Sequence, residues 1–130
     1  MGASGRCECG GVHYVVSGEL RDVYDCHCAR CRRITGHYIA ATAAPVEQVT
    51  FVVDQTLTWY SPDPSVEYGF CNRCGSTMFW RAQANPESLS IAAGTLDPPT
   101  GLRTTKAWWV SQASDYHVRP NDVVEHLFEG

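Results

Sequence analysis

The stretch Cys71-Asn72-Arg73-Cys74-Gly75 decides how this chain of 130 residues folds, because it has the form of a metal-binding knuckle. A turn of this length brings the two sulfurs to one point, and glycine tolerates the positive φ that often follows. Upstream, Cys7-Glu8-Cys9 is followed by two glycines in the same relation, and in an extended segment its two thiols share one face. Two such pairs supply four thiolates, which is a closed tetrahedral site of the structural zinc type.

The two pairs are separated by 61 residues, positions 10–70, which is far more than the spacing within a zinc finger. A shared metal would therefore join the N-terminal segment to the middle of the chain. Because metal-binding free energy becomes folding free energy in such proteins, we expect the loss of either pair to unfold the domain.

A third group, Cys26-His27-Cys28-Ala29-Arg30-Cys31, holds the remaining cysteines. Four of the seven cysteines belong to the first site, so three remain. Three protein ligands with a vacant fourth position are typical of catalytic zinc. The vacant position can take water or the thiolate of a substrate. The alternative is a histidine as fourth ligand: His27 points away from its neighbours if its segment is extended, whereas His37 can reach the group after a turn. Spacing alone also permits other divisions of the seven cysteines.

The number and grouping of the cysteines favour metal ligation. The count is odd, and a reducing compartment disfavours a disulfide framework. Buried structural cysteines would follow the periodicity of the core, whereas these form three tight local groups. Four thiolates also suit a single iron or an iron–sulfur cluster, but none of the usual cluster spacings occurs in the sequence. Zinc is therefore the expected metal, in two sites.

Composition and charge exclude several classes of protein. The length allows one domain with a real core, and 44% apolar and 18% charged residues are typical of a globular protein. The net charge of −4 disfavours a nucleic-acid partner, because affinity for phosphates comes from clustered Lys and Arg. No apolar run approaches the ~18 residues that span a bilayer, and residues 1–6 show no signal peptide. We expect a soluble, cytoplasmic protein without a membrane partner.

Between the cysteine groups the sequence predicts β structure. Short runs rich in β-branched and aromatic residues alternate with Gly, Pro and polar turns. Only the segment 28–34, ended by Gly36, suits a helical turn or two. Residues 1–130 are therefore expected to form a single all-β domain of short antiparallel strands. The expected strands are 12–16, 21–26, 37–43, 49–53, 57–61, 66–70, 77–80, 88–93 and 106–111.

Three ordered segments of the sequence resemble the glutathione-dependent formaldehyde-activating (GFA) family. They are Gly5-Arg6-Cys7-Glu8-Cys9-Gly10-Gly11-Val12, Cys26-His27-Cys28-Ala29-Arg30-Cys31-Arg32-Arg33 and Phe70-Cys71-Asn72-Arg73-Cys74-Gly75-Ser76. The segments 94–97 and 108–110 continue the resemblance, so it covers nearly the whole chain. The resemblance implies a β-tent fold with two zinc sites. It matches Cys7, Cys9, Cys71 and Cys74 to structural ligands, and Cys26, Cys28 and Cys31 to catalytic ones.

The resemblance also implies an activity, that of a carbon–sulfur lyase which joins glutathione and formaldehyde, or a related thiol and aldehyde. Zinc at the three-cysteine site would hold the thiol as its nucleophilic thiolate. Arg32 and Arg33 are candidates for binding the carboxylates of a tripeptide thiol, or alternatively for screening the negative cluster. His27 is a candidate proton donor to the developing alkoxide, with a structural role as its alternative.

A second function class is a non-catalytic zinc module that binds a partner protein, because the resemblance extends to a centromere-associated protein. Cys28→Ser distinguishes the two classes, because it should abolish turnover by an enzyme and leave the binding of a partner intact. Six aromatic residues could line a substrate pocket, with core packing as their alternative role. These residues are Trp59, Tyr60, Trp80, Trp108, Trp109 and Tyr116.

Overall fold

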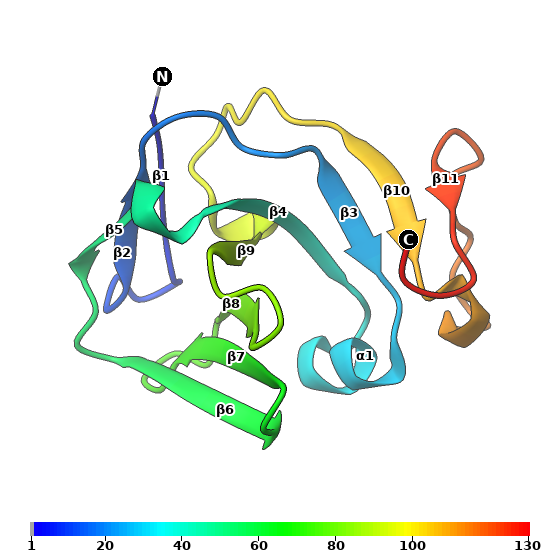
Figure 1. Ribbon diagram of the computed structural model, residues 1–130, viewed down its shortest axis with the longest axis horizontal. Coiled ribbons are helices and arrows are strands. Elements are labelled where there is room, and N and C mark those ends of the chain that lie inside the picture. The colour runs from blue at the N-terminus through cyan, green and yellow to red at the C-terminus, as the bar shows by residue number, and fades with distance from the viewer. Residues whose placement is uncertain (1) are drawn as a thin grey trace.

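The computed structural model describes residues 2–130, and strands dominate that part of the chain (Figure 1). The all-β prediction is confirmed: residues 2–130 form eleven strands, one α-helix and three short 3-10 turns. The smaller sheet, at the left of Figure 1, has three antiparallel strands in the order β1-β2-β5. Its strands are β1 (Ala3–Arg6), β2 (His13–Val16) and β5 (Val49–Val53).

The larger sheet has eight strands in the order β11-β10-β3-β4-β9-β8-β7-β6. From β3 to β6 along this order, neighbours pair antiparallel, as expected. Strand β10 instead runs parallel to β3 and β11. The chain reaches β10 by a long crossover from β9 along the top of Figure 1, and a crossover is what allows it to lie parallel to β3. The strands are β3 (Val23–Cys26), β4 (Ile39–Pro45), β6 (Leu57–Asp63), β7 (Val66–Cys71), β8 (Thr77–Ala82), β9 (Ser88–Ala92), β10 (Thr104–Trp108) and β11 (Val124–Glu125).

The structure differs from the expected strand pattern at both ends of the chain. Strand β1 has no β-branched or aromatic residue and is extended because it pairs along its length with β2. Strand β11 is only two residues long and is held at the edge of the sheet by β10. The strand expected at 106–111 ends at Trp108, because Trp109 has left-handed backbone and the 3-10 turn Val110–Gln112 follows.

The helix α1 (Ala29–Thr35) forms where the sequence predicted a helical turn. Cys28 caps its N-terminus, with its sulfur accepting a hydrogen bond from the N–H of Cys31 at 3.3 Å. Gly36 ends it in left-handed conformation, with a φ of 85°. These two caps fix a short helix directly after β3. Within residues 2–130, no helix is long and apolar enough to cross a bilayer.

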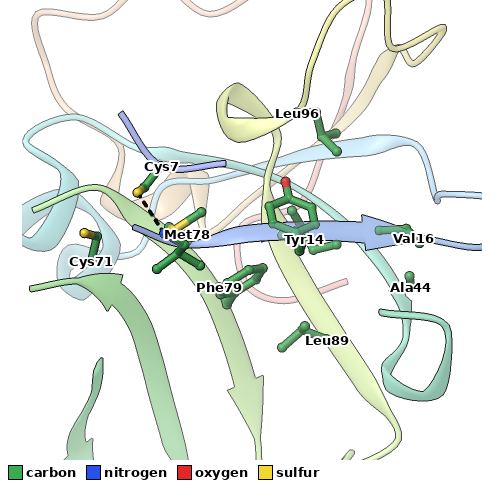
Figure 2. Close-up of a cluster of buried hydrophobic side chains, with 11 residues drawn as sticks. Cys7, Tyr14, Val16, Ala44, Cys71, Met78, Phe79, Leu89 and Leu96 are labelled. Atoms are coloured by element: carbon green, nitrogen blue, oxygen red, sulfur yellow. Dashed lines mark hydrogen bonds between the residues drawn. The ribbon is translucent and has the colours of Figure 1, made fainter. Parts of the chain in front are cut away.

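The main core lies between the small sheet and strands β8 and β9 of the large one (Figure 2). Tyr14 and Phe79 meet edge to face with ring centroids 5.2 Å apart, and Phe51 adds a second edge-to-face contact at 5.4 Å. Cys7 and Cys71 lie at one end of this cluster in Figure 2 and belong to it. The four-cysteine group is therefore continuous with the core.

Phe79→Ala is expected to destabilise the protein by about 3–5 kcal/mol, the usual cost of truncating a fully buried phenylalanine. Phe79 has 0% exposure and joins Tyr14, Phe51 and Trp59, so the cavity would sit at the centre of the core. Urea unfolding of the metal-loaded protein measures this free energy. A loss below about 1 kcal/mol would contradict the central place given to Phe79.

Candidate metal centres and the adjoining pocket

Two groups of cysteine sulfurs lie close enough to share a metal ion, and they are the two groups that the spacing predicted. Within each group the Sγ atoms all lie within 4.8 Å of one another. All the cysteines are free thiols. The first group is Cys7, Cys9, Cys71 and Cys74, and the second, here called the trio, is Cys26, Cys28 and Cys31.

The spacing of the sulfurs in the first group fits a tetrahedral metal. Four sulfurs about 2.3 Å from a zinc ion at tetrahedral angles lie about 3.8 Å from one another. The structure places Cys7 Sγ 3.7 Å from Cys9 Sγ, and Cys9 Sγ 3.6 Å from Cys71 Sγ. A disulfide would need about 2.05 Å. The donor set and its dimensions therefore suit Zn²⁺, and the group can hold a metal ion.

Burial raises the pKa of Cys7, and hydrogen bonds to the sulfurs of this group oppose that effect by favouring the thiolate form. The N–H of Val12 donates to Cys7 Sγ at 3.3 Å, and the hydroxyl of Thr56 lies 3.1 Å from Cys71 Sγ. Both cysteines are buried, with 1% and 0% exposure, so water does not supply these donors. Donors that satisfy an anion stabilise it against protonation, which is what metal ligation requires.

The outer two cysteines of the first group are stabilised by polar side chains. The guanidinium Nε of Arg73 donates to Cys9 Sγ at 3.2 Å, which places a cation beside a cluster of thiolates. Hydrogen bonds from the side chain and backbone of Ser76 lower the pKa of Cys74 to about 5. At neutral pH this ligand is therefore already ionised.

The trio is assembled where β3 meets α1. Cys26 ends the strand, and its sulfur lies 3.6 Å from that of Cys31, again close to the edge of a metal–thiolate tetrahedron. Hydrogen bonds from the thiols of Cys26 and Cys31, with help from backbone N–H groups of α1, lower the pKa of Cys28 to about 2. The helix start thus supplies one thiolate before any metal binds.

Within residues 2–130, no histidine or carboxylate completes the trio. The buried ring of His27 packs on Tyr38 at 4.8 Å and lies 5.8 Å from the ring of His117. Burial lowers the pKa of His27 to about 4, so the ring is neutral at pH 7. His37 Nδ1 lies 3.2 Å from the hydroxyl of Tyr116. The structure therefore does not bring His27 or His37 to the sulfurs of the trio.

A pocket of about 400 Å³ adjoins the trio, and all three of its cysteines line it. The same pocket has aromatic walls from strands that are distant in sequence, and Arg21 and Arg30 also line it. A three-thiolate group in the wall of an apolar pocket leaves one coordination position for a small molecule. The aromatic residues that line the pocket are Tyr24, Tyr68, Trp80, Trp108 and Trp109.

A family model described as glutathione-dependent formaldehyde-activating enzyme matches residues 2–112. The chain belongs to this GFA family. A crystal structure of a Rhodobacter sphaeroides protein is similar to this GFA chain, with 28% sequence identity and a TM-score of 0.62. The similarity covers 75% of the GFA chain described here and 91% of the Rhodobacter sphaeroides chain. A comparison with curated proteins found no match.

The arginines predicted for substrate binding in this GFA chain do not line the pocket. Arg32 and Arg33 lie in the last turn of α1. Arg30, one turn earlier, does line the pocket and forms an ion pair with Asp63 at 3.3 Å. His27 also lies outside the lining. Substrate roles for Arg32 and Arg33, and a catalytic role for His27, stay predictions.

The six aromatic candidates divide between the pocket and other places. Trp80, Trp108 and Trp109 line the pocket of this GFA chain. Trp59 instead packs against Phe79 in the core. The remaining two, Tyr60 and Tyr116, are exposed.

Sequence reasoning missed Tyr68, which touches the trio of this GFA chain. Its hydroxyl lies 3.4 Å from Cys31 Sγ, and the residue is only 3% exposed. Burial raises the pKa of Tyr68, so the group stays protonated and can donate to a thiolate. The residue sits in a strand that leads to the other cysteine group, so sequence spacing carries no signal of this contact.

Tyr68→Phe is expected to weaken metal binding at the trio by about tenfold, because outer hydrogen bonds to metal ligands typically contribute 10–100-fold in affinity. The ring stays and only the donor to Cys31 is lost, so the fold persists. Competition with a chelator measures the affinity. Tyr14→Phe is the matched control, since it removes a buried hydroxyl that bonds Thr95 at 2.7 Å in the core. Equal affinities in the two variants would contradict the role of Tyr68.

Proposed function

We propose that this GFA chain is a zinc-dependent carbon–sulfur lyase that forms or cleaves the adduct of a thiol, glutathione or a similar one, with an aldehyde. The observation that carries the proposal is the trio in the wall of a pocket, with no fourth protein ligand in residues 2–130. We further propose that residues 1–130 act as one domain in the reducing cytoplasm, where thiols remain available for ligation.

In this proposal the two cysteine groups have different tasks. Cys7, Cys9, Cys71 and Cys74 hold a structural zinc that is part of the core. Cys26, Cys28 and Cys31 hold a second zinc which, when bound, would keep the sulfur of the substrate thiol ionised and nucleophilic. The closed set of four supports the first assignment, and the open set of three supports the second.

The chain's own side chains position and shield the reacting groups. Tyr68 donates to Cys31 and thereby fixes the orientation of one ligand of the trio. The aromatic walls supply apolar surface beside the sulfurs, which would keep water from hydrating the carbonyl carbon that the thiol attacks. Arg30 lines the pocket, and its guanidinium can bind a carboxylate of the substrate.

Exchange spectroscopy by NMR tests the proposal, because glutathione and formaldehyde also combine without a catalyst. With zinc-loaded protein, the exchange rate between free and adduct glutathione should rise in proportion to protein concentration. A panel of aldehydes extends the measurement. If no aldehyde gave a rate above the uncatalysed one, the chain would not be a lyase of this type, and the non-catalytic zinc module would become the better assignment.

A further inference from the structure

The pocket beside the trio is larger and more apolar than a one-carbon aldehyde requires. Its volume of about 400 Å³ is within the range of sites for far larger ligands, whereas formaldehyde has two non-hydrogen atoms. The side chains of Ile39, Val66, Trp80 and Trp108 form much of its wall. The hydroxymethyl group of a formaldehyde adduct is too small to cover this apolar surface, which stays in contact with water. A larger apolar substituent would cover the surface and remove it from water.

Several polar residues at the pocket are hydrogen-bonded to the protein or lie at its rim, whereas the indole N–H of Trp108 is buried without a hydrogen-bond partner among residues 2–130. Arg21 donates to the carbonyl of Ala41 at 2.8 Å. Gln112 accepts a hydrogen bond from a backbone N–H of α1 at 2.7 Å. Gln112, Arg30 and Glu129 are exposed, and so they mark the solvent side of the pocket. The charged body of a peptide thiol suits this rim, and the interior suits the carbonyl component.

Trp109, which lines the pocket, has a strained backbone conformation. With φ of 59° and ψ of 38°, it is the one non-glycine residue within 2–130 that has positive φ. A bulky side chain is costly in this region and persists only where its surroundings enforce it, often at functional sites. Here the Trp109 N–H donates to the carbonyl of Phe128 at 3.2 Å, and the two rings meet edge to face at 5.5 Å.

We propose that the pocket selects an aldehyde with a bulky apolar substituent, such as an aromatic ring, over formaldehyde, with Trp109 as its specificity-determining wall. This rests on the proposed function, because the aldehyde must meet a thiol at the trio. The sulfur forms a bond to the carbonyl carbon, the carbon–oxygen double bond becomes single, and the thiol proton ends on oxygen. The addition needs no further reagent.

Two measurements on the zinc-loaded protein test the selectivity independently. The first compares kcat/KM for benzaldehyde and formaldehyde with glutathione, each divided by the rate constant of its uncatalysed reaction, because formaldehyde is intrinsically the more electrophilic aldehyde. The second compares the affinities of S-benzylglutathione and S-methylglutathione by calorimetry, since these mimic the two adducts without reacting. Each buried methylene contributes roughly fourfold to affinity, so both ratios should favour the benzyl member by at least about tenfold.

Trp109→Gly tests the role of the strained wall. Glycine adopts positive φ without strain, so this variant is expected to fold. Both ratios should fall by at least about tenfold, because the wall is gone. Tyr60→Ala is the control: it removes an aromatic ring that is 53% exposed on β6 and outside the pocket, and it should leave both ratios unchanged.

The outcomes separate this inference from the proposed function. Faster turnover of formaldehyde, with equal affinities for the two analogues, would overturn the inference and leave the lyase intact. Preference for S-benzylglutathione without turnover of any aldehyde would support the apolar pocket and overturn the lyase. Unchanged ratios in Trp109→Gly, or no measurable binding of either analogue, would overturn the inference.

Discussion

Cys71→Ser is expected to leave the protein largely unfolded at neutral pH. Cys71 is fully buried, and its sulfur lies 3.6 Å from that of Cys9 across the junction of the N-terminal segment with β7. A structural zinc contributes about 10–16 kcal/mol in small domains, which is comparable with the 5–15 kcal/mol by which folded domains are usually stable. Losing one of four ligands removes enough of that free energy to make the unfolded state the more stable one.

Cys71→Ser also destabilises the protein because it disturbs hydrogen bonds to the sulfur of Cys71. Thr56 and the backbone N–H groups of Arg73 and Cys74 donate to it, and a serine oxygen is too short to meet them all. Far-UV circular dichroism and urea unfolding measure the result, with Cys28→Ser as the matched control. A Cys71→Ser protein with a native spectrum and full metal content would refute the structural assignment of the four-cysteine group.

Cys28→Ser is expected to reduce turnover to the uncatalysed rate while the fold persists. Changes to outer hydrogen bonds of metal sites already cost 10–100-fold in activity, so loss of a ligand should cost at least about 100-fold. Cys28 also caps α1 through its bond with the Cys31 N–H, and serine is itself a good cap, so the helix is retained. The variant therefore separates chemistry from folding.

Adduct exchange by NMR and circular dichroism, measured on one sample of Cys28→Ser, provide the check. A native spectrum together with lost exchange is the expected pair of results. Exchange at the wild-type rate would show that the trio does not act in the reaction. An unfolded protein would show instead that the trio is structural, like the four-cysteine group.

The grouping of the cysteines could be predicted because ligand geometry is local. In Cys7-Glu8-Cys9 and in the knuckle at 71–74, a few backbone angles decide where two sulfurs meet. The end of the helix after Cys28 was likewise predictable, from the glycine at position 36. Such features depend on residues a few positions apart.

The pocket could not be predicted because its walls come together only through long-range pairing. Strand β10 lies parallel to β3, which brings Trp108 opposite Cys26. The local sequence does not predict this pairing of β10 with β3. The same holds for Tyr68, whose partner Cys31 is 37 positions away, and for the left-handed backbone at Trp109, which the Phe128 segment enforces. Tertiary contacts override local preference at all three places.

The arginines of α1 show that a correctly predicted helix does not tell which of its side chains contact the pocket. The helix was expected, but which of its side chains reach the pocket depends on how α1 is rotated against β4 and β7. Arg30 lines the pocket, whereas Arg32 and Arg33 do not. Arg32 is turned by about 200° from Arg30 around the helix, and Arg33 lies about 4.5 Å further along its axis, so proximity in sequence to the trio did not fix proximity in space.

The most direct test of the account is the number of zinc ions per chain, measured by native mass spectrometry on protein purified without chelator or affinity-tag metal. Two cysteine groups with different coordination predict two zinc ions in the wild-type chain and one in Cys28→Ser. A single zinc in the wild-type chain that Cys28→Ser leaves in place would contradict the assignment of the trio as a metal site, and with it the proposed chemistry.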